Sequence, residues 1–317
     1  MSYDVASQTE NASLTRQTSA SRTKRRNRED APSRATRASS PTTAAARPTP
    51  ARSQPRPLDT RKGEMSSAAK SAAKRLMVFG GTGFVGSAIV EEAVRRGLAV
   101  TCVTRTGTPP EHILAQAWSA NVDWLPGDAL RPETYRDAMG TADAVVTSVG
   151  VLPLPSLTHE EVVRGNGDTN VVPARTAKEL GVDRLVVVGA SIPPFVPGVA
   201  FGVPGLFEAG YAKGKKMALA FARDEFVGEE KKRGAVVLQP GGVSGTRYTG
   251  GRALPLWIAM SPVSRLLRAV PVNAVAELAP TPVGNVARAA VAAATEEKYA
   301  KRFEVIDNLR LLREFDE

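Results

Sequence analysis

The chain has 317 residues, of which 42% are hydrophobic, and it contains one cysteine and two histidines. A single cysteine excludes a disulfide framework and any cysteine-rich zinc or iron–sulfur site, while the hydrophobic content is enough for a packed core. The net charge of +10 is unevenly placed, because residues 1–70 hold 14 Lys and Arg residues but only 6 Asp and Glu residues. The rest of the chain is close to neutral, so we expect no nucleic acid among its partners.

Residues 1–71 are rich in Ser, Thr, Arg, Ala and Pro and contain few large apolar side chains. Such a segment cannot bury enough apolar surface to offset the entropy cost of ordering, which predicts a disordered basic tail. Arg- and Ser-rich N-termini are also typical of organelle transit peptides. We therefore expect import into an organelle. A solvated tail without a targeting role is the alternative, and it is favoured by the acidic residues Asp4, Glu10, Glu29 and Asp30.

Residues 72–317 alternate between strand-like and helix-like segments. Short apolar runs predict buried strands at 74–80, 98–105, 122–128, 143–150, 184–191, 234–242 and 302–308. Apolar residues at helical spacing predict helices at 84–97, 131–140 and about 158–180. Because parallel neighbours need a helical crossover, this alternation predicts an α/β fold with a doubly wound parallel sheet.

A glycine-rich loop joins the first predicted strand to the first predicted helix, and it reads Gly80-Gly81-Thr82-Gly83-Phe84-Val85-Gly86. Gly80 permits the tight turn, Gly83 lets backbone amides approach a pyrophosphate, and Gly86 lets the helix pack closely against the sheet. The free amides and the positive end of the helix then bind the phosphates. Between a strand and a helix, this spacing predicts a Rossmann-type dinucleotide-binding loop, and we expect all seven residues to contact the cofactor.

Residues at the ends of the next three strands complete the predicted cofactor site. The second strand ends at Arg105 without the Asp or Glu that would bind a ribose 2′-hydroxyl, and an arginine can neutralise a 2′-phosphate. We therefore predict NADP as the cofactor, with NAD as the alternative. Asp128, after the third strand, would accept a hydrogen bond from the adenine amino group. Ser148 and Gly150, after the fourth strand, would let the cofactor pass close to the backbone.

From about Lys74 onward the chain resembles the atypical, extended-type short-chain dehydrogenase/reductases. The resemblance rests on GGTGFVG at 80–86, GD at 127–128, NGDTNVVPARTAKELGVDRLVVVGAS at 166–191, YAKGK at 211–215 and QPGGVSGTR at 239–247. Within that superfamily the chain is most similar to an organelle-targeted group of plant mitochondrial and plastid NAD(P)-binding proteins. Relatives of that group are the fungal ubiquinone-biosynthesis oxidoreductase and the Rossmann-type accessory subunit of respiratory complex I.

The resemblance implies a catalytic Tyr-x-x-x-Lys pair, and Tyr211 and Lys215 have this spacing. One helical turn would put the Lys215 ammonium beside the Tyr211 phenol and lower the pKa of that phenol. Tyr211 would then exchange a proton with a carbonyl or alcohol while the nicotinamide moves a hydride. Lys215 would also hold the nicotinamide ribose, and Ser191 would polarise the substrate oxygen. Either Asn166 or Asn170 would complete the proton relay.

The same resemblance puts Pro240 and Gly241 on the nicotinamide side of the pocket. The stretch 185–207 carries no charge, and it would form a substrate lid or, alternatively, an apolar mouth for a lipid-like substrate or a membrane surface. The elements on the substrate side would come from about 192–233 and 246–300, the latter as a small C-terminal subdomain.

These features together predict an NAD(P)(H)-binding oxidoreductase that acts on a hydrophobic carbonyl or a quinone-pathway intermediate in an organelle. We expect a mitochondrial location, with the chloroplast as the alternative, and peripheral contact with an inner membrane or a membrane complex. The alternative function is a non-catalytic, cofactor-stabilised accessory or assembly factor of a membrane-bound respiratory or ubiquinone-synthesis complex. No metal site is expected, because His112 and His159 lie far apart in the sequence.

Overall fold

The computed structural model describes residues 73–154, 156–191, 210–228, 232–249, 252–269 and 277–316. All of them belong to the second of two units into which the chain divides, Met1–Ser66 and Ser67–Glu317. The predicted disordered tail lies outside the described residues, as does the predicted lid from residue 192 onward. No helix in the described part of the chain is long and apolar enough to cross a membrane.

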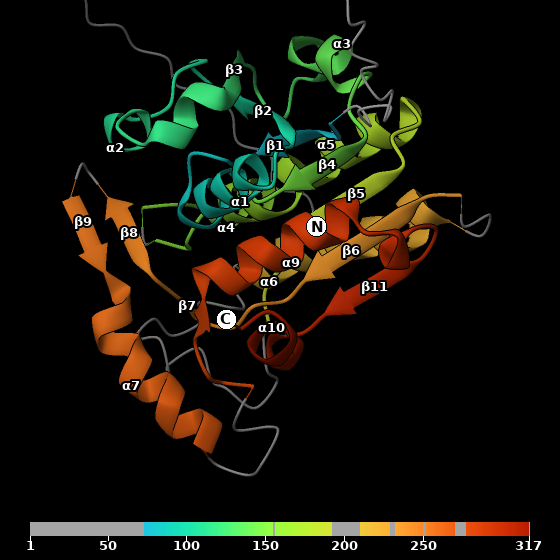
Figure 1. The fold of residues 1–317 in the computed structure, drawn as a ribbon. Coiled ribbons are helices and arrows are strands. Elements are labelled where there is room, and N and C mark those ends of the chain that lie inside the picture. The colour runs from blue at the N-terminus through green and yellow to red at the C-terminus, as the bar shows by residue number, and fades with distance from the viewer. Residues whose placement is uncertain are drawn as a thin grey trace, which may run out of the picture. The chain divides into compact units, whose positions relative to one another are not determined.

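Seven parallel strands form the central sheet, in the order β11-β6-β5-β4-β1-β2-β3 (Figure 1). They are β1 (Arg75–Phe79), β2 (Ala99–Thr104), β3 (Val122–Pro126), β4 (Ala144–Thr147), β5 (Arg184–Val188), β6 (Gly234–Leu238) and β11 (Phe303–Ile306). The predicted doubly wound parallel sheet is confirmed, and each predicted strand range contains one observed strand. The strand order reverses between β1 and β4, and open α/β sheets bind ligands at such a switch point.

Helices cover both faces of the sheet. One face carries α1 (Phe84–Arg95), α9 (Val283–Thr295) and α10 (Asn308–Glu314). The other face carries α3 (Arg136–Met139), α5 (Asp168–Glu179), α6 (Ala212–Ala220) and the π-helical turn η5 (Phe221–Val227). Successive strand residues point to opposite faces, so Val78 belongs to the first core and Phe79 to the second.

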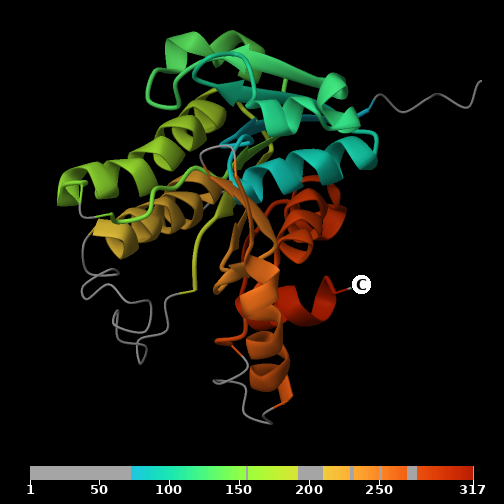
Figure 2. The same ribbon diagram turned by 90° about the vertical axis from the view of Figure 1, so that its left-hand side faces the viewer.

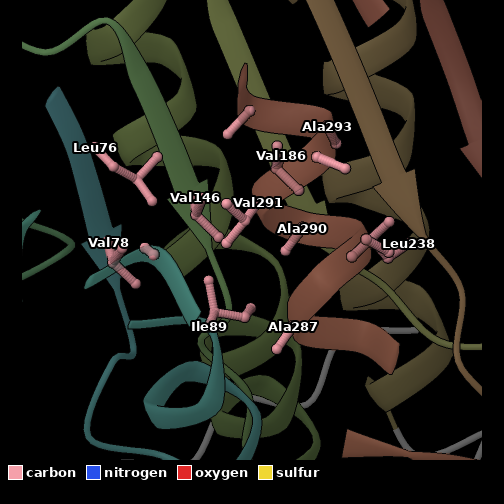
Figure 3. Packing of buried hydrophobic residues seen from close by; sticks show 14 of the residues in the cluster. Leu76, Val78, Ile89, Val146, Val186, Leu238, Ala287, Ala290, Val291 and Ala293 are labelled. Carbon is pink, nitrogen blue, oxygen red and sulfur yellow. The ribbon is translucent and has the colours of Figure 1, made fainter. Parts of the chain in front are cut away.

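Small side chains let α9 lie close against the sheet. Ala287, Ala290 and Ala293 are buried on the helix face that meets Val146 and Val186 of the strands (Figure 3). Short methyl side chains leave little space between helix and strand backbones, so the core is dense without large residues. Although α9 falls within the predicted substrate-side range 246–300, it serves as a cover of the sheet.

The prediction of one helix over about 158–180 is wrong, because two helices, α4 (His159–Asn166) and α5, meet at Gly167. A Cβ on Gly167 would lie 3.2 Å from the Cα of Gly214 in α6 and 2.9 Å from the Val163 carbonyl oxygen. The break therefore lies where another helix crosses closely, a contact that helical spacing in the sequence does not reveal. The predicted helix at 131–140 is likewise divided, into the 3-10 turn η2 (Pro132–Thr134) and α3.

The elements between β6 and α9 lie outside the main sheet. Strand β7 (Val243–Ser244) pairs in parallel with β10 (Thr281–Pro282), and β8 (Thr246–Thr249) pairs antiparallel with β9 (Arg252–Pro255). Helix α7 (Leu256–Ala269) follows β9 directly. Figures 1 and 2 show β8, β9 and α7 extending away from the sheet.

Candidate functional site

The predicted site residues lie along the edge of the sheet that is formed by the carboxyl ends of the strands. Because all seven strands are parallel, these ends share one edge of the sheet. The loops that leave this edge carry residues 80–86 after β1, Arg105 after β2, Asp128 after β3, Ser148 and Gly150 after β4, Ser191 after β5, and Pro240 and Gly241 after β6. The structure thus brings together six groups of residues that are spread over 160 positions of the sequence.

The glycine loop is closed so tightly that Gly80 and Gly86 leave no room for a side chain. Gly80 has φ +83°, in the region that favours glycine, and the Gly83 N–H donates to the Gly80 carbonyl oxygen at 2.9 Å. A Cβ on Gly86 would lie 2.1 Å from that same oxygen and 2.6 Å from the Ser148 hydroxyl. Both glycines are therefore required by the loop geometry itself.

The start of α1 is left without a charged or capping partner from its own sequence. Gly83 precedes the helix and makes no side-chain cap, and the first turn contains no acidic residue. The N–H groups and the positive end of the helix dipole are consequently available to an anion. Together with the tight turn in which Gly80 and Gly86 have no Cβ, this arrangement fits the pyrophosphate of a dinucleotide.

Gly81 has a packing role that the sequence did not indicate. A Cβ at this position would lie 2.3 Å from the sulfur of Cys102, which is fully buried in β2. Burial raises the pKa of the Cys102 thiol to about 12, so the group is neutral at physiological pH. The thiol therefore acts as a small apolar support beneath the loop.

Arg105 and Asp128 lie on neighbouring loops, because β2 pairs with β3. Arg105 is exposed, and the turn that follows it closes through Gly107, with φ +70° and an N–H donated to the Thr104 carbonyl oxygen. The Asp128 carboxylate accepts the N–H of Leu130 at 2.9 Å. This hydrogen bond fixes the carboxylate at the strand end, while the guanidinium of Arg105 faces solvent.

Lys215 is buried and reaches the ends of two strands. Its Nζ donates to the carbonyl oxygen of Val188, the last residue of β5, at 2.9 Å, and to that of Val149, just after β4, at 3.4 Å. Burial lowers the pKa of Lys215 to about 8, because the surrounding protein solvates the ammonium less well than water does. Lys215 therefore places a titratable amine at the carboxyl ends of β4 and β5, in the middle of the sheet edge that carries the predicted site residues.

Tyr211 lies one helical turn before Lys215, as predicted from the spacing, with the Lys215 Nζ 6.0 Å from the centre of the tyrosine ring. The expectation that Lys215 lowers the pKa of Tyr211 is wrong in this structure, since burial raises the pKa of the phenol instead. The ammonium is directed at two backbone carbonyls, so loss of water around the phenol dominates. Tyr211 consequently stays protonated at neutral pH.

The two candidate asparagines differ in their hydrogen bonds. Asn166 uses its whole amide, accepting from the Val151 N–H and donating to the carbonyl oxygens of Val151 and Val162. Asn170 donates to the carbonyl oxygens of Val149 and Asn166, at 3.0 and 2.9 Å. Its Oδ1 is buried without a hydrogen-bond partner. Of the two, Asn170 is therefore the one with a free acceptor, and it shares the Val149 carbonyl oxygen with Lys215.

Ser191 and Lys215 line one cavity of about 290 Å³. The Ser191 N–H donates to the Pro240 carbonyl oxygen at 2.8 Å, which ties the loop after β5 to the loop after β6. The cavity is also lined by Glu277 and Asp307, which sequence reasoning missed. Neither residue belongs to a motif, and only the fold brings them to the cavity.

Pro240 and Gly241 are held by the C-terminal part of the chain. The Gly241 N–H donates to the Oδ1 of Asn308 at 2.7 Å, and the buried Asn308 amide also donates to the carbonyl oxygens of Glu277 and Ala279. Across the described residues, no cluster of three His, Cys, Asp or Glu side chains could hold a metal ion.

Comparison with known proteins agrees with this geometry. Residues 80–247 match the family described as NAD(P)H-binding. An oxidoreductase of the short-chain dehydrogenase/reductase family from Burkholderia thailandensis has a TM-score of 0.54 at 18% identity, covering 76% of this chain and 94% of that one. At this identity the similarity shows the fold alone, which is a Rossmann fold.

Three curated relatives cover different shares of the chain. The uncharacterized chloroplastic protein At1g32220 of Arabidopsis thaliana is 29% identical over 239 residues, 71% of this chain and 73% of the relative. The MIOREX complex component 2 of Saccharomyces cerevisiae is 38% identical over 80 residues, 25% of this chain and 29% of the relative. The photosystem II assembly factor Ycf39 of Synechocystis is 29% identical over 126 residues, 39% and 36% of the two chains.

Proposed function

The chain belongs to the NAD(P)H-binding family, and from this we propose that it is an NADP-dependent oxidoreductase of the atypical short-chain dehydrogenase/reductase type. Its substrate would be a hydrophobic carbonyl compound or a quinone-pathway intermediate. The observation that carries the proposal is the position of Lys215, buried at the same sheet edge as the glycine loop and one helical turn from Tyr211. Nucleotide binding alone would account for Lys215, whereas the Tyr211 hydroxyl beside it supplies the proton donor that a reductase needs.

Each residue has a separate task in the proposed reaction. A bound nicotinamide supplies or accepts the hydride. The Tyr211 hydroxyl, whose pKa is raised by burial, donates its proton to the substrate oxygen, which favours the reductive direction. Ser191 orients that oxygen, and Lys215 holds the nicotinamide ribose.

Asn170 is the second polar group that we assign to this relay. Its free Oδ1 can accept a hydrogen bond from a water molecule or hydroxyl that resupplies the proton. Asn166 is not assigned to the relay, because its amide is already satisfied by the backbone.

The preference for NADP rests on Arg105. Its guanidinium is exposed after β2, where a 2′-phosphate would lie, and the turn at 104–107 offers no carboxylate that would repel that phosphate. The remaining cofactor contacts would come from the seven loop residues, Asp128, Ser148, Gly150, Pro240 and Gly241.

Turnover of the full chain tests the proposal. NADPH oxidation would be followed with short-chain quinones and with apolar aldehydes and ketones. We expect Tyr211→Phe to lower kcat by about 100-fold or more while NADPH binding is unchanged. Full activity in Tyr211→Phe would exclude the proposed acid. Lys216→Met, which removes an amine beside the same cavity, is the matched control and should retain most of the activity.

A non-catalytic role as an accessory or assembly factor is the second candidate. It is favoured by the names of two relatives, one a photosystem II assembly factor and the other a component of a complex. Under this function, co-purification with a membrane-bound complex would survive Tyr211→Phe but be lost with Gly83→Asp. Under the oxidoreductase function, Tyr211→Phe should instead abolish the function of the protein in the same cells.

We further propose that residues 1–71 direct the protein to an organelle, the mitochondrion first and the chloroplast second. The basic, Arg- and Ser-rich composition supports import, and one relative is named as chloroplastic. Fusing residues 1–71 to a fluorescent protein tests this directly. A fusion that stays in the cytosol would contradict it.

A further inference from the structure

The hairpin and helix at 246–269, here called the arm, expose apolar side chains that the core does not use. Ile258 and Leu266 of α7 are 58% and 70% exposed, and Leu254 and Tyr248 of the hairpin are 45% and 42% exposed. All four residues of β9, Arg252–Pro255, are exposed. These four apolar side chains are more than half of the large exposed hydrophobic residues in the described part of the chain.

Among the residues of α7 whose side chains the structure describes, the exposed ones lie on one side of the helix. Successive residues of a helix are rotated by about 100° around its axis. At this rotation the exposed residues share a stripe roughly 100° wide, which is formed by Ile258, Pro262, Arg265, Leu266 and Ala269. The half-buried Leu256 and Leu267 lie opposite to it. A water-exposed helix normally turns its polar side outward, whereas this stripe is apolar except for one arginine.

The charge of the arm is of one sign. Residues 246–269 contain Arg247, Arg252, Arg265 and Arg268 and no Asp or Glu. Arg252 and Arg265 are exposed, next to the exposed leucines and isoleucine. Arginine can lay its aliphatic stem on an apolar surface and extend its charge to phosphate groups.

The arm is also anchored to the nucleotide-binding body. The Tyr248 ring stacks on the His112 ring of α2 (Glu111–Leu114), with centroids 4.2 Å apart and planes at 15°. Gly245, just before β8, lies against the Phe84 ring at the start of α1, since a Cβ there would be 3.0 Å from that ring. Whatever binds the arm is therefore held beside the glycine loop.

We propose that the arm is a docking surface for an anionic membrane. The apolar stripe of α7 lies at the boundary of headgroups and acyl chains, and the exposed Arg252 and Arg265 contact lipid phosphates. Exposed aliphatic side chains combined with arginines and no acidic residue complement a lipid surface of negative charge. The proposal goes beyond the oxidoreductase function and does not depend on turnover.

An environment-sensitive label on α7 tests the proposal in the full chain. Cys102 is buried, so a cysteine introduced as Ile258→Cys can be labelled selectively with a fluorescent maleimide. We expect a blue shift, and quenching by brominated acyl chains, on vesicles of mixed phosphatidylcholine and phosphatidylglycerol but not on phosphatidylcholine alone. The control label is at Asp137→Cys, exposed on α3, which Figures 1 and 2 place at the far end from α7. It should show neither effect, even where the basic tail contributes to vesicle binding.

The same label distinguishes the membrane from two alternative occupants of the stripe, a second copy of the chain and a segment of the same chain. No shift at Ile258 on anionic vesicles, or equal shifts at both labels, would overturn the proposal. A blue shift without vesicles would overturn it as well. If that shift grows with protein concentration, the occupant is a second copy of the chain; if it does not, a segment of the same chain covers the stripe.

A pair of matched charge variants provides a second readout. Ile258→Asp combined with Leu266→Asp should weaken pelleting with anionic vesicles by about tenfold or more. Ala120→Asp combined with Asn121→Asp adds the same charge at exposed positions before β3 and should change it by less than about twofold. Equal losses in the two variants would show that only net charge matters and would contradict docking by the arm.

Discussion

Lys215 and Asn170 donate hydrogen bonds to the same backbone carbonyl, that of Val149, at 3.4 and 3.0 Å. Lys215 also reaches the Val188 carbonyl oxygen at 2.9 Å, so one amine joins the carboxyl ends of β4 and β5. The Asn170 amide enters this network through its Nδ2, while its Oδ1 has no hydrogen-bond partner. The site edge is therefore held together by the residues to which we assign proton transfer and cofactor binding.

The buried amine makes stability depend on pH. Burial lowers the pKa of Lys215 to about 8 in the folded chain, against about 10.4 when unfolded. As the pH rises, the folded state loses the Lys215 proton before the unfolded state does. Burial of the charged amine therefore lowers the free energy of unfolding most below pH 8, and this destabilisation disappears as the pH rises toward 10. Relative to Lys215→Met, the wild type should gain up to roughly 3 kcal/mol over that interval.

Urea unfolding of both proteins near neutral pH and near pH 10 measures this difference. Subtracting the variant removes the titration of all other groups. A difference that stays constant with pH would mean that Lys215 titrates normally.

The glycine loop should not tolerate a methyl group at Gly86. The added Cβ would meet the Gly80 carbonyl oxygen, which belongs to the backbone and cannot move aside. We expect Gly86→Ala to cost roughly 3 kcal/mol or more and to abolish nucleotide binding. The matched control is Gly140→Ala, where φ is −58° and the nearest atom is 3.4 Å away. It should be neutral or stabilise by up to about 1 kcal/mol. Thermal unfolding that ranks the two variants the other way would contradict this geometry.

Cys102 should be inert in the native protein. Its burial and its raised pKa leave almost no accessible thiolate at neutral pH. A thiol reagent is expected to react only as fast as the chain unfolds, with full reaction in denaturant. Rapid reaction in native buffer would show that the packing of Cys102 against Gly81 opens in the folded protein and exposes the thiol.

Arg105 should determine cofactor choice. Arg105→Ala removes the cation at the end of β2 and should weaken NADPH binding by about 10- to 100-fold, with little change for NADH. Arg136→Ala, on α3 and paired with Glu179, is the control for loss of one arginine. Equal losses for both nucleotides in Arg105→Ala would indicate a role in folding rather than in recognition.

The strands were predictable because each is a short apolar run that ends at a turn. The single helix predicted at 158–180 was wrong, since the two helices meet at Gly167, where Gly214 of another helix approaches closely, and this contact is not visible in the sequence. Motif spacing correctly put Tyr211 one turn from Lys215, but the pKa of Tyr211 depends on burial that spacing does not encode. The contact between Gly81 and Cys102 joins the glycine loop to β2 and likewise follows only from the fold.

A titration of the full chain with NADPH and NADH tests the central claim most directly, with Gly83→Asp as the blank. Gly83 has φ −82° and ψ 172°, and its Cβ would meet only the Gly80 carbonyl oxygen at 3.2 Å, so this variant should fold while placing a carboxylate at the phosphate site. We predict saturable binding that favours NADPH and is lost in Gly83→Asp. Absence of binding by either nucleotide, or equal binding by the folded variant, would contradict the account.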